Sequence, residues 1–238
     1  MVKHVGLWAE GRYPQTQVRI LPGLFCGLMI TQKDVWNKLS DSWVHLRTKP
    51  DREVIDFSKK INQGPIIDLG CGDCRNLIPF LQKEIYCVGM DFSKGMIRET
   101  KKFLKRRKLN SDLVIGSLNN VPFKGGSFLL MLCIRTLHHL ETKELRLRAL
   151  KEMKRIGIKI LTCDWKRWQF RFIWKLIRSF FEGHFADVYV DWNYHGRIYK
   201  RFYHLYTKKE LEGDLKSAGL KIEKIWYDDG NIWSLVNV

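Results

Sequence analysis

The chain of 238 residues is poor in acidic side chains and lacks the patterns that define several classes of protein. No internal repeat or low-complexity tract occurs, and 45% of the residues are apolar, so a repeat protein and a disordered chain are excluded. The apolar run from Ile20 to Ile30 contains Pro22 and Gly23 and is too short to span a bilayer. The length then fits one globular domain with a full-sized core.

The six cysteines show no framework of disulfides or zinc ligands. Cys87, Cys133 and Cys163 lie within apolar strand patterns, which is typical of reduced, buried thiols. Cys71 and Cys74 form a C-x-x-C, but no second Cys or His pair has ligand spacing, and Cys71 lies inside a glycine turn. We therefore predict no metal site and a reducing, cytoplasmic location.

Positive charge is what the sequence has in excess: 42 Lys and Arg exceed 25 Asp and Glu by 17. Such an excess favours a polyanionic partner, nucleic acid first and an anionic membrane second, although it also serves simple solubility. Eight of the basic residues fall in a predicted helix over 93–108, where a solvated face and an RNA-facing patch are both possible interpretations.

The chain is organised around the stretch P-I-I-D-L-G-C-G-D-C-R at residues 65–75. A buried strand ends at Asp68, a glycine turn follows at Gly70 and Gly72, and apolar residues with helical spacing come next. Glycines let the backbone of such a turn approach a ligand closely, and the amides that open the helix favour an anionic group. Asp91 follows the next strand, about 20 residues on, where an acid suits the hydroxyls of a ribose.

Strands and helices alternate through the rest of the chain. Strand patterns recur at 86–90, 113–116, 128–134 and 158–163, and helical patterns lie between them at 93–108 and 142–156. A last helix at 208–218 precedes strands at 221–226 and 232–236, which we expect to form a hairpin. This order predicts an α/β fold with a seven-stranded, mostly parallel sheet and helices on both faces.

The ends of the chain and one internal segment differ from this pattern. Residues 31–238 form the predicted domain, and residues 1–30 are an extension of uncertain role: an accessory strand or cap, or an over-long start that precedes the true first residue, Met29. Within the domain, about 164–205 is predicted to be a substrate-side insertion. Its first part, 165–181, alternates aromatic and cationic residues, which suits either stacking on unpaired bases or a helix packed on the sheet.

D-L-G-C-G followed by an acid at the second strand resembles motifs I and II of class I S-adenosylmethionine (SAM) methyltransferases, which are Rossmann-like. The resemblance implies that SAM is the cofactor and that the two motifs and the end of the third strand hold it. The residues implied are Asp68, Gly70, Cys71, Gly72, Asp91, Phe92, Ser117 and Leu118.

From about Lys33 to Val238 the chain resembles one family within this class, the tRNA wobble-uridine carboxymethyl methyltransferases. The motifs are K-R-F-Y-H-L-Y at 200–206, D-D-G-N-I-W at 228–233, L-H-H-L at 137–140, D-V-Y-V-D-W at 187–192 and H-L-R-T-K-P at 45–50. These enzymes methylate the carboxylate of 5-carboxymethyluridine in tRNA and work with a small zinc-ribbon activator. The resemblance therefore implies SAM-dependent tRNA methylation, with tRNA and such an activator as partners in a heterodimer.

The family motifs also imply a substrate side. Its catalytic residues would be Arg47, His138, His139, Arg201, Tyr203 and His204. Contacts to RNA would come from Lys49, Trp165, Lys166, Arg167 and Arg171.

Three positions depart from the family pattern. Thr48 replaces an aromatic that could stack on a base, Phe202 replaces a tyrosine, and Ser117 stands where an aspartate usually binds the adenine amino group. Two alternatives therefore stay open. One is a SAM methyltransferase for a small molecule, and the other is a methyltransferase-like RNA-binding subunit without turnover.

Overall fold

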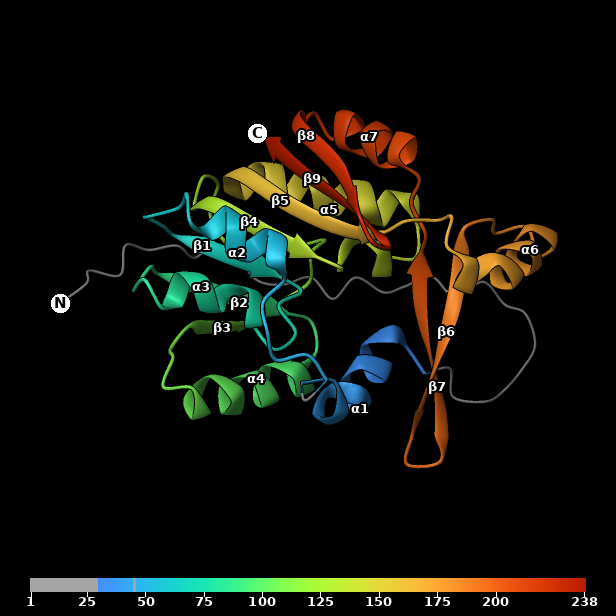
Figure 1. The fold of residues 1–238 in the computed structure, drawn as a ribbon, viewed down its shortest axis with the longest axis horizontal. Helices are drawn as coiled ribbons and strands as arrows, with labels where there is room; N and C mark the ends of the chain where they lie inside the picture. The colour runs from blue at the N-terminus through green and yellow to red at the C-terminus, as the bar shows by residue number, and fades with distance from the viewer. Residues whose placement is uncertain (1–29, 45) are drawn as a thin grey trace.

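Four consecutive buried residues, Ile66–Leu69, form strand β1 of the computed structural model (Figure 1). β1 pairs in parallel with β2 on one side and β4 on the other, which explains why its side chains are apolar toward both faces of the sheet. The structure describes residues 30–44 and 46–238. The predictions for residues 1–29 lie outside the described residues.

In the described part of the chain, the main sheet has seven strands in the order β3-β2-β1-β4-β5-β9-β8. The first five are mutually parallel, and β9 runs antiparallel to β5 and β8. The predicted seven-stranded, mostly parallel sheet and its closing hairpin are therefore confirmed. The strands are β1 (Ile66–Leu69), β2 (Cys87–Asp91), β3 (Asp112–Ile115), β4 (Phe128–Ile134), β5 (Gly157–Trp165), β8 (Lys221–Asp228) and β9 (Asn231–Asn237).

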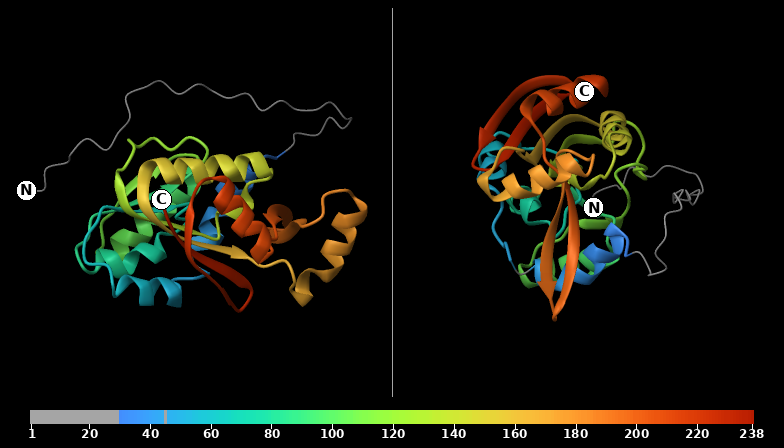
Figure 2. Two further views of the ribbon diagram at one scale, coloured as in Figure 1. Left: turned by 90° about the horizontal axis from the view of Figure 1, so that it is seen from above. Right: turned by 90° about the vertical axis from the view of Figure 1, so that its right-hand side faces the viewer.

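Helices cover both faces of this sheet (Figures 1 and 2). One hydrophobic cluster joins the sheet to the first four helices, and a second joins its other face to α5 and α7. The helices are α1 (Gln32–Val44), α2 (Arg52–Ser58), α3 (Ile78–Leu81), α4 (Lys94–Arg106), α5 (Lys143–Ile156), α6 (Ile173–Phe181) and α7 (Lys208–Ser217), with single 3-10 turns η1 (Arg75–Leu77), η2 (Leu137–His139) and η3 (Phe170–Phe172).

Side-chain caps begin the long helices where the sequence predicts. Ser93 Oγ accepts from the N–H of Met96 at 3.1 Å, and Thr142 caps α5 in the same way. The basic side chains of α4 are exposed, as a solvated face requires. Because α4 follows β2 and runs back along the sheet, its basic last turn lies away from the carboxyl ends of the strands (Figure 1).

A two-stranded hairpin, β6 (Asp187–Tyr194) and β7 (Arg197–His204), stands apart from the main sheet (Figure 1). D-V-Y-V-D-W at 187–192 was interpreted only as a family motif, and this hairpin was not predicted. Its turn is His195-Gly196, both with positive φ, as a type I′ turn requires. Phe172 of η3 and Leu176 of α6 pack on the hairpin, so the interpretation of 165–181 as a stripe packed on the main sheet is wrong.

The turn after β1 tolerates only glycine at Gly70. Its φ is +74°, and a Cβ there would lie 2.1 Å from Thr136 Cγ2 and 2.8 Å from Thr136 Cβ. Gly126 also has a positive φ, +68°, but a Cβ there would meet nothing within 4 Å.

We therefore expect Gly70→Ala to destabilise the protein more than Gly126→Ala. The left-handed conformation alone costs a residue with a Cβ about 1–2 kcal/mol, and overpacking against Thr136 adds about 1–3 kcal/mol. Urea denaturation of both variants measures the difference in the free energy of unfolding. Equal losses in the two variants would show that the contact with Thr136 does not constrain this turn.

Candidate functional site

A pocket lies at the carboxyl ends of β1, β2, β4 and β5, the edge at which ligands bind in open parallel sheets. All eight residues predicted to hold SAM line it, together with five of those predicted for the substrate side. The predicted residues that line the pocket are Arg47, Asp68, Gly70, Cys71, Gly72, Asp91, Phe92, Ser117, Leu118, His138, His139, Trp165 and Tyr203.

The glycine turn is held against the end of β2. The N–H groups of Gly70 and Cys71 both donate to the Met90 carbonyl, at 2.7 and 3.0 Å. The N–H of Gly72 donates to Asp91 Oδ2 at 3.1 Å. The turn and the acid of the second strand therefore form one unit.

Asp91 is the acid of that unit, and only 6% of its surface is exposed. Its other oxygen, Oδ1, accepts from the N–H of Ser93 at 2.9 Å. Burial raises the pKa of Asp91 to about 6, although the two amides favour its charged form. Each carboxylate oxygen has a second lone pair, so Asp91 can still accept hydrogen bonds from two hydroxyl groups.

The rest of this half of the pocket suits the other parts of SAM. Burial raises the pKa of Asp68 to about 8, although the positive charge of Arg75 opposes this shift. An ammonium group bound beside Asp68 would favour its charged form further. Phe92, Met96 and Leu118 form an apolar wall at the position expected for an adenine ring. The residues present therefore fit SAM.

His138 and His139 lie in the substrate half as two neutral imidazoles with opposite tautomers. His138 Nδ1 accepts from the backbone N–H of Trp165 at 3.1 Å, so the proton sits on Nε2, which is buried without a partner among the described residues. His139 Nδ1 donates to the Phe202 carbonyl at 2.9 Å, which leaves Nε2 as an acceptor. Burial lowers the pKa of His139 to about 4 and that of His138 well below its usual value.

Because His138 is neutral, its interaction with Asp164 is a backbone hydrogen bond and not an ion pair. Its Nδ1 lies 3.3 Å from Asp164 Oδ1, but an unprotonated Nδ1 forms no ion pair with a carboxylate. Asp164 instead accepts from the backbone N–H of His138 at 3.1 Å, which orients the turn that carries both histidines. Asp164 is fully buried, and burial raises its pKa to about 7.

Tyr203 contributes a hydroxyl group, and Arg201 orients it. Arg201 Nη1 donates to Tyr203 Oη at 2.8 Å, so the hydroxyl proton stays free for the pocket. Burial raises the pKa of Tyr203 to about 12. Its ring stacks on Trp165 with centroids 4.2 Å apart and an interplanar angle of 4°.

Arg201 itself does not line the pocket. Its guanidinium lies 5.3 Å from the ring centroid of Trp43 and 4.8 Å from that of Trp192, and the residue is 5% exposed. This aromatic surrounding holds the cation by cation–π contacts instead of presenting it to a ligand. The structure therefore places Arg201 outside the pocket lining, where its contact with the site runs through the hydroxyl of Tyr203.

His204 is the other predicted catalytic residue that the structure places elsewhere. Its Nδ1 lies 2.6 Å from Asp187 Oδ1 and its Nε2 lies 3.0 Å from Glu210 Oε1. Burial opposes the charged imidazolium, but the two carboxylates raise the pKa of His204. This residue joins the hairpin to α7 and leaves no ring nitrogen for a substrate.

The predicted RNA-contacting residues are divided between separate surfaces. Lys49 is exposed and lines none of the three pockets that contain predicted residues. Arg171 lies 4.5 Å over the ring of Trp165 at the mouth of the pocket. Lys166 and Arg167 line a second cleft, and Arg167 forms an ion pair with Glu210.

Several pocket residues were not predicted from the sequence. Arg135 directly follows β4 and pairs with Asp51, which also faces Arg75 at 3.6 Å. Arg47, which lines the pocket, has no ion pair among the described residues. Arg135 follows the predicted strand 128–134, and this position at a strand end was the one feature of the sequence that could have placed it in the pocket. Other such lining residues are Trp36, Trp43, Asn76, Met96, Ile134, Thr136 and Leu140.

Within residues 30–44 and 46–238, no group of three or more His, Cys, Asp or Glu side chains could hold a metal ion. No helix in the same residues has the length and apolar character needed to cross a membrane.

Comparison with known proteins agrees with the pocket. Residues 66–157 match the family described as methyltransferase domain. A protein of Encephalitozoon cuniculi named as a methyltransferase is 32% identical over 164 residues, which cover 66% of this chain and 70% of that protein. The tRNA (carboxymethyluridine(34)-5-O)-methyltransferase of Schizosaccharomyces pombe is 26% identical over 225 residues, or 84% of this chain and 92% of the relative.

Solved structures show the same fold. A SAM-dependent methyltransferase of Methanosarcina mazei superposes with a TM-score of 0.67 at 16% identity, covering 74% of this chain and 93% of that chain. The predicted Rossmann-like fold of class I methyltransferases, with SAM as cofactor, is therefore confirmed.

The position of Asp91 predicts how SAM binding responds to mutation and pH. Asp91→Ala should weaken binding by about 2 kcal/mol, because hydrogen bonds to a charged acceptor are lost. Protonation removes the same acceptor, so affinity should fall as pH is lowered through about 6, the pKa of Asp91. Calorimetric titration with SAM between pH 5 and pH 8, values roughly spanning that pKa, measures both effects.

Asp91→Asn is the control, because an amide does not titrate. Its affinity should be low and should lose the change near pH 6, whereas any change near pH 8, the pKa of Asp68, should remain. A wild-type pH profile in Asp91→Asn, or an unchanged dissociation constant in Asp91→Ala, would contradict the role of Asp91.

Proposed function

The chain belongs to the class I SAM-dependent methyltransferases, and we propose that it methylates the carboxylate of 5-carboxymethyluridine at the wobble position of tRNA. The observation that carries this proposal is the composition of the substrate half of the pocket. Arg47, the hydroxyl of Tyr203 and two neutral histidines meet there beside the residues that fit SAM. The relative from S. pombe, which is named for this reaction, supports the same substrate.

The chemistry requires no strong base. A carboxylate with a pKa near 4, as is usual for such groups, is already ionised and can act as the nucleophile. SAM supplies an electrophilic methyl group on a sulfonium. The pocket then has to hold the carboxylate in line with that methyl group, and such placement can contribute roughly 7–11 kcal/mol to lowering the barrier.

The side chains divide this task. His138 Nε2–H and the Tyr203 hydroxyl are donors that can orient the carboxylate oxygens, and Arg47 can neutralise their charge. His139 Nε2 can accept from a hydroxyl or an imide N–H of the substrate. The family pattern has an aromatic residue at the position of Thr48, where it could stack on a base. The stacked rings of Trp165 and Tyr203 can offer an aromatic face for such stacking instead.

The direct test is mass spectrometry of wobble nucleosides from tRNA that carries 5-carboxymethyluridine, after incubation with SAM, the protein and the zinc-ribbon activator. We expect one added methyl group on the carboxymethyl side chain. Methylation of a small carboxylic acid but not of tRNA would favour the small-molecule alternative. SAM binding without any transfer would favour the RNA-binding subunit without turnover.

Arg47 and Lys49 form a matched pair for the substrate side, since only Arg47 lines the pocket. Arg47→Ala should lower kcat/KM for tRNA roughly thirtyfold, equivalent to about 2 kcal/mol for a lost charge-assisted hydrogen bond. Lys49→Ala should change it by less than about threefold, as expected for an exposed charge. Initial rates of methyl transfer measure both, and equal effects would refute the assigned role of Arg47.

For partners, we propose that a zinc-ribbon activator pairs with strand β3. This strand is at the sheet edge, where it pairs only with β2 among the described strands. Its last residue, Ile115, is 47% exposed, whereas Val114 packs against the core. Edge strands with exposed apolar side chains accept an added strand from a partner.

The five cysteines of the described residues are free and buried, which supports a reducing, cytoplasmic location.

Ile115→Lys tests this interface without disturbing the core. We expect the variant to lose co-purification with the activator, because a charged side chain replaces the exposed apolar surface. SAM binding by calorimetry should be unchanged and serves as the control for folding. Retention of the activator by the variant would exclude β3 as its docking strand.

A further inference from the structure

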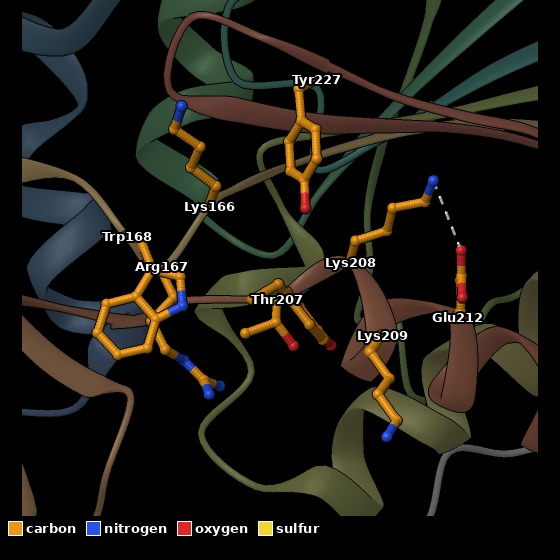
Figure 3. A pocket seen from close by; sticks show the side chains of 9 residues that line it. Lys166, Arg167, Trp168, Thr207, Lys208, Lys209, Glu212 and Tyr227 are labelled. Carbon is orange, nitrogen blue, oxygen red and sulfur yellow. Dashed lines mark ion pairs between the residues drawn. The ribbon is translucent and has the colours of Figure 1, made fainter.

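A second cleft, with a volume of about 750 Å³, opens outside the catalytic pocket (Figure 3). Three segments form it: the chain that leaves β5, the start of α7 and the end of β8. The two sites meet at the end of β5, because Trp165 lines the catalytic pocket and the next residue, Lys166, lines the cleft. The lining residues are Lys166, Arg167, Trp168, Tyr206, Thr207, Lys208, Lys209, Glu212 and Tyr227.

The backbone that forms one wall of the cleft is held in place. Lys166 N–H donates to the Gly230 carbonyl at 2.9 Å, and Arg167 N–H donates to the Tyr206 carbonyl at 2.7 Å. Arg167 also donates to the Leu205 carbonyl and pairs with Glu210, so its charge is used within the protein. The cleft is therefore formed before any ligand binds.

The cleft carries an excess of positive charge. Lys208 faces Glu212 at 3.9 Å, and Glu212 is the single acidic residue among the described residues that line the cleft (Figure 3). Lys166 and Lys209 have no carboxylate partner in the described part of the chain. At least two ammonium groups are thus available for an anionic ligand, and the exposed, flexible lysine side chain binds phosphate as a point charge.

Two aromatic side chains accompany these cations. Trp168 is 67% exposed and Tyr227 is 56% exposed. Figure 3 shows the indole and the phenol ring bordering the same space as Lys208. Lys166 Nζ lies 6.0 Å from the ring centroid of Tyr227. Exposed rings beside free ammonium groups are the arrangement that binds unpaired nucleotides, with bases stacked on the rings and phosphates on the cations.

We propose that this cleft binds an unpaired ribonucleotide segment next to the nucleotide that enters the catalytic pocket. The inference rests on the proposed function, since a macromolecular RNA substrate must extend beyond the pocket. Lys166, Lys209, Trp168 and Tyr227 carry the binding, and Glu212 weakens it. The cleft thereby adds Lys209 and Tyr227, from α7 and β8, to the RNA-contacting residues. An acidic peptide could match the lysines, but it would not use the two exposed rings.

The test measures binding of a short, unstructured, fluorescein-labelled oligoribonucleotide by fluorescence anisotropy. The double variant Lys166→Glu/Lys209→Glu should bind roughly tenfold or more weakly, with a log–log salt dependence shallower by about 2. Trp168→Ala should also lose about tenfold, the lower end of the range for one stacked base. Glu212→Gln should bind more tightly, a gain that misfolding cannot produce.

Lys151→Glu/Lys216→Glu is the matched control, because it changes the net charge equally at exposed positions outside the cleft. Equal losses in the two double variants would overturn the proposal, since general electrostatics would then explain binding. A polyglutamate peptide that competes as well as RNA would also overturn it, in favour of an acidic protein partner.

The assay requires no methyl transfer, so it separates this inference from the proposed function. If no tRNA is methylated but the cleft variants lose RNA affinity relative to the control, the cleft stands and the catalytic proposal fails. If tRNA is methylated and the cleft variants bind RNA like the control, the catalytic proposal stands and the cleft proposal fails.

Discussion

The attachment of the glycine turn to the end of β2 is the contact on which the functional half of the molecule depends. Backbone amides of the turn donate to the Met90 carbonyl and to the Asp91 carboxylate. These bonds bring the ends of β1 and β2 together, and they leave lone pairs of a buried carboxylate facing the pocket. The sheet thereby places a fixed acceptor beside a turn that only glycine can form at Gly70. The cofactor half of the pocket follows from this one arrangement.

The substrate half depends on burial. His138 and His139 are kept neutral because an imidazolium in this surrounding would be poorly solvated. Backbone groups then select opposite tautomers, so the pair presents one donor and one acceptor. Arg201 acts indirectly, by holding the hydroxyl of Tyr203 from within an aromatic cage. A carboxylate nucleophile needs such orientation more than it needs a base.

The distribution of charge separates general attraction from specific contact. The basic face of α4 is solvated, and its last turn points away from the strand ends that form the site. The cations near the site either pair with carboxylates, as Arg135 does, or stay available, as Arg47 and Lys209 do. The formal charge of +17 can attract RNA over long distances, but only the available cations can position it.

Local sequence determined the sheet and the edge at which the pocket lies. Fully apolar strands must be buried on both faces, glycines mark the turn, and the carboxyl ends of parallel strands meet at one edge. The resemblance to SAM methyltransferases named the eight residues expected to hold the cofactor, and all eight line the pocket at this edge. The same reasoning missed the β6–β7 hairpin, because its alternating residues were interpreted only as a family motif. It also could not separate His138 from His204: no residue in the described part of the chain accepts from Nε2–H of His138, whereas the two ring nitrogens of His204 face Asp187 and Glu210. Tertiary structure alone decided these roles, because the partners that occupy or free a polar side chain come from distant parts of the chain.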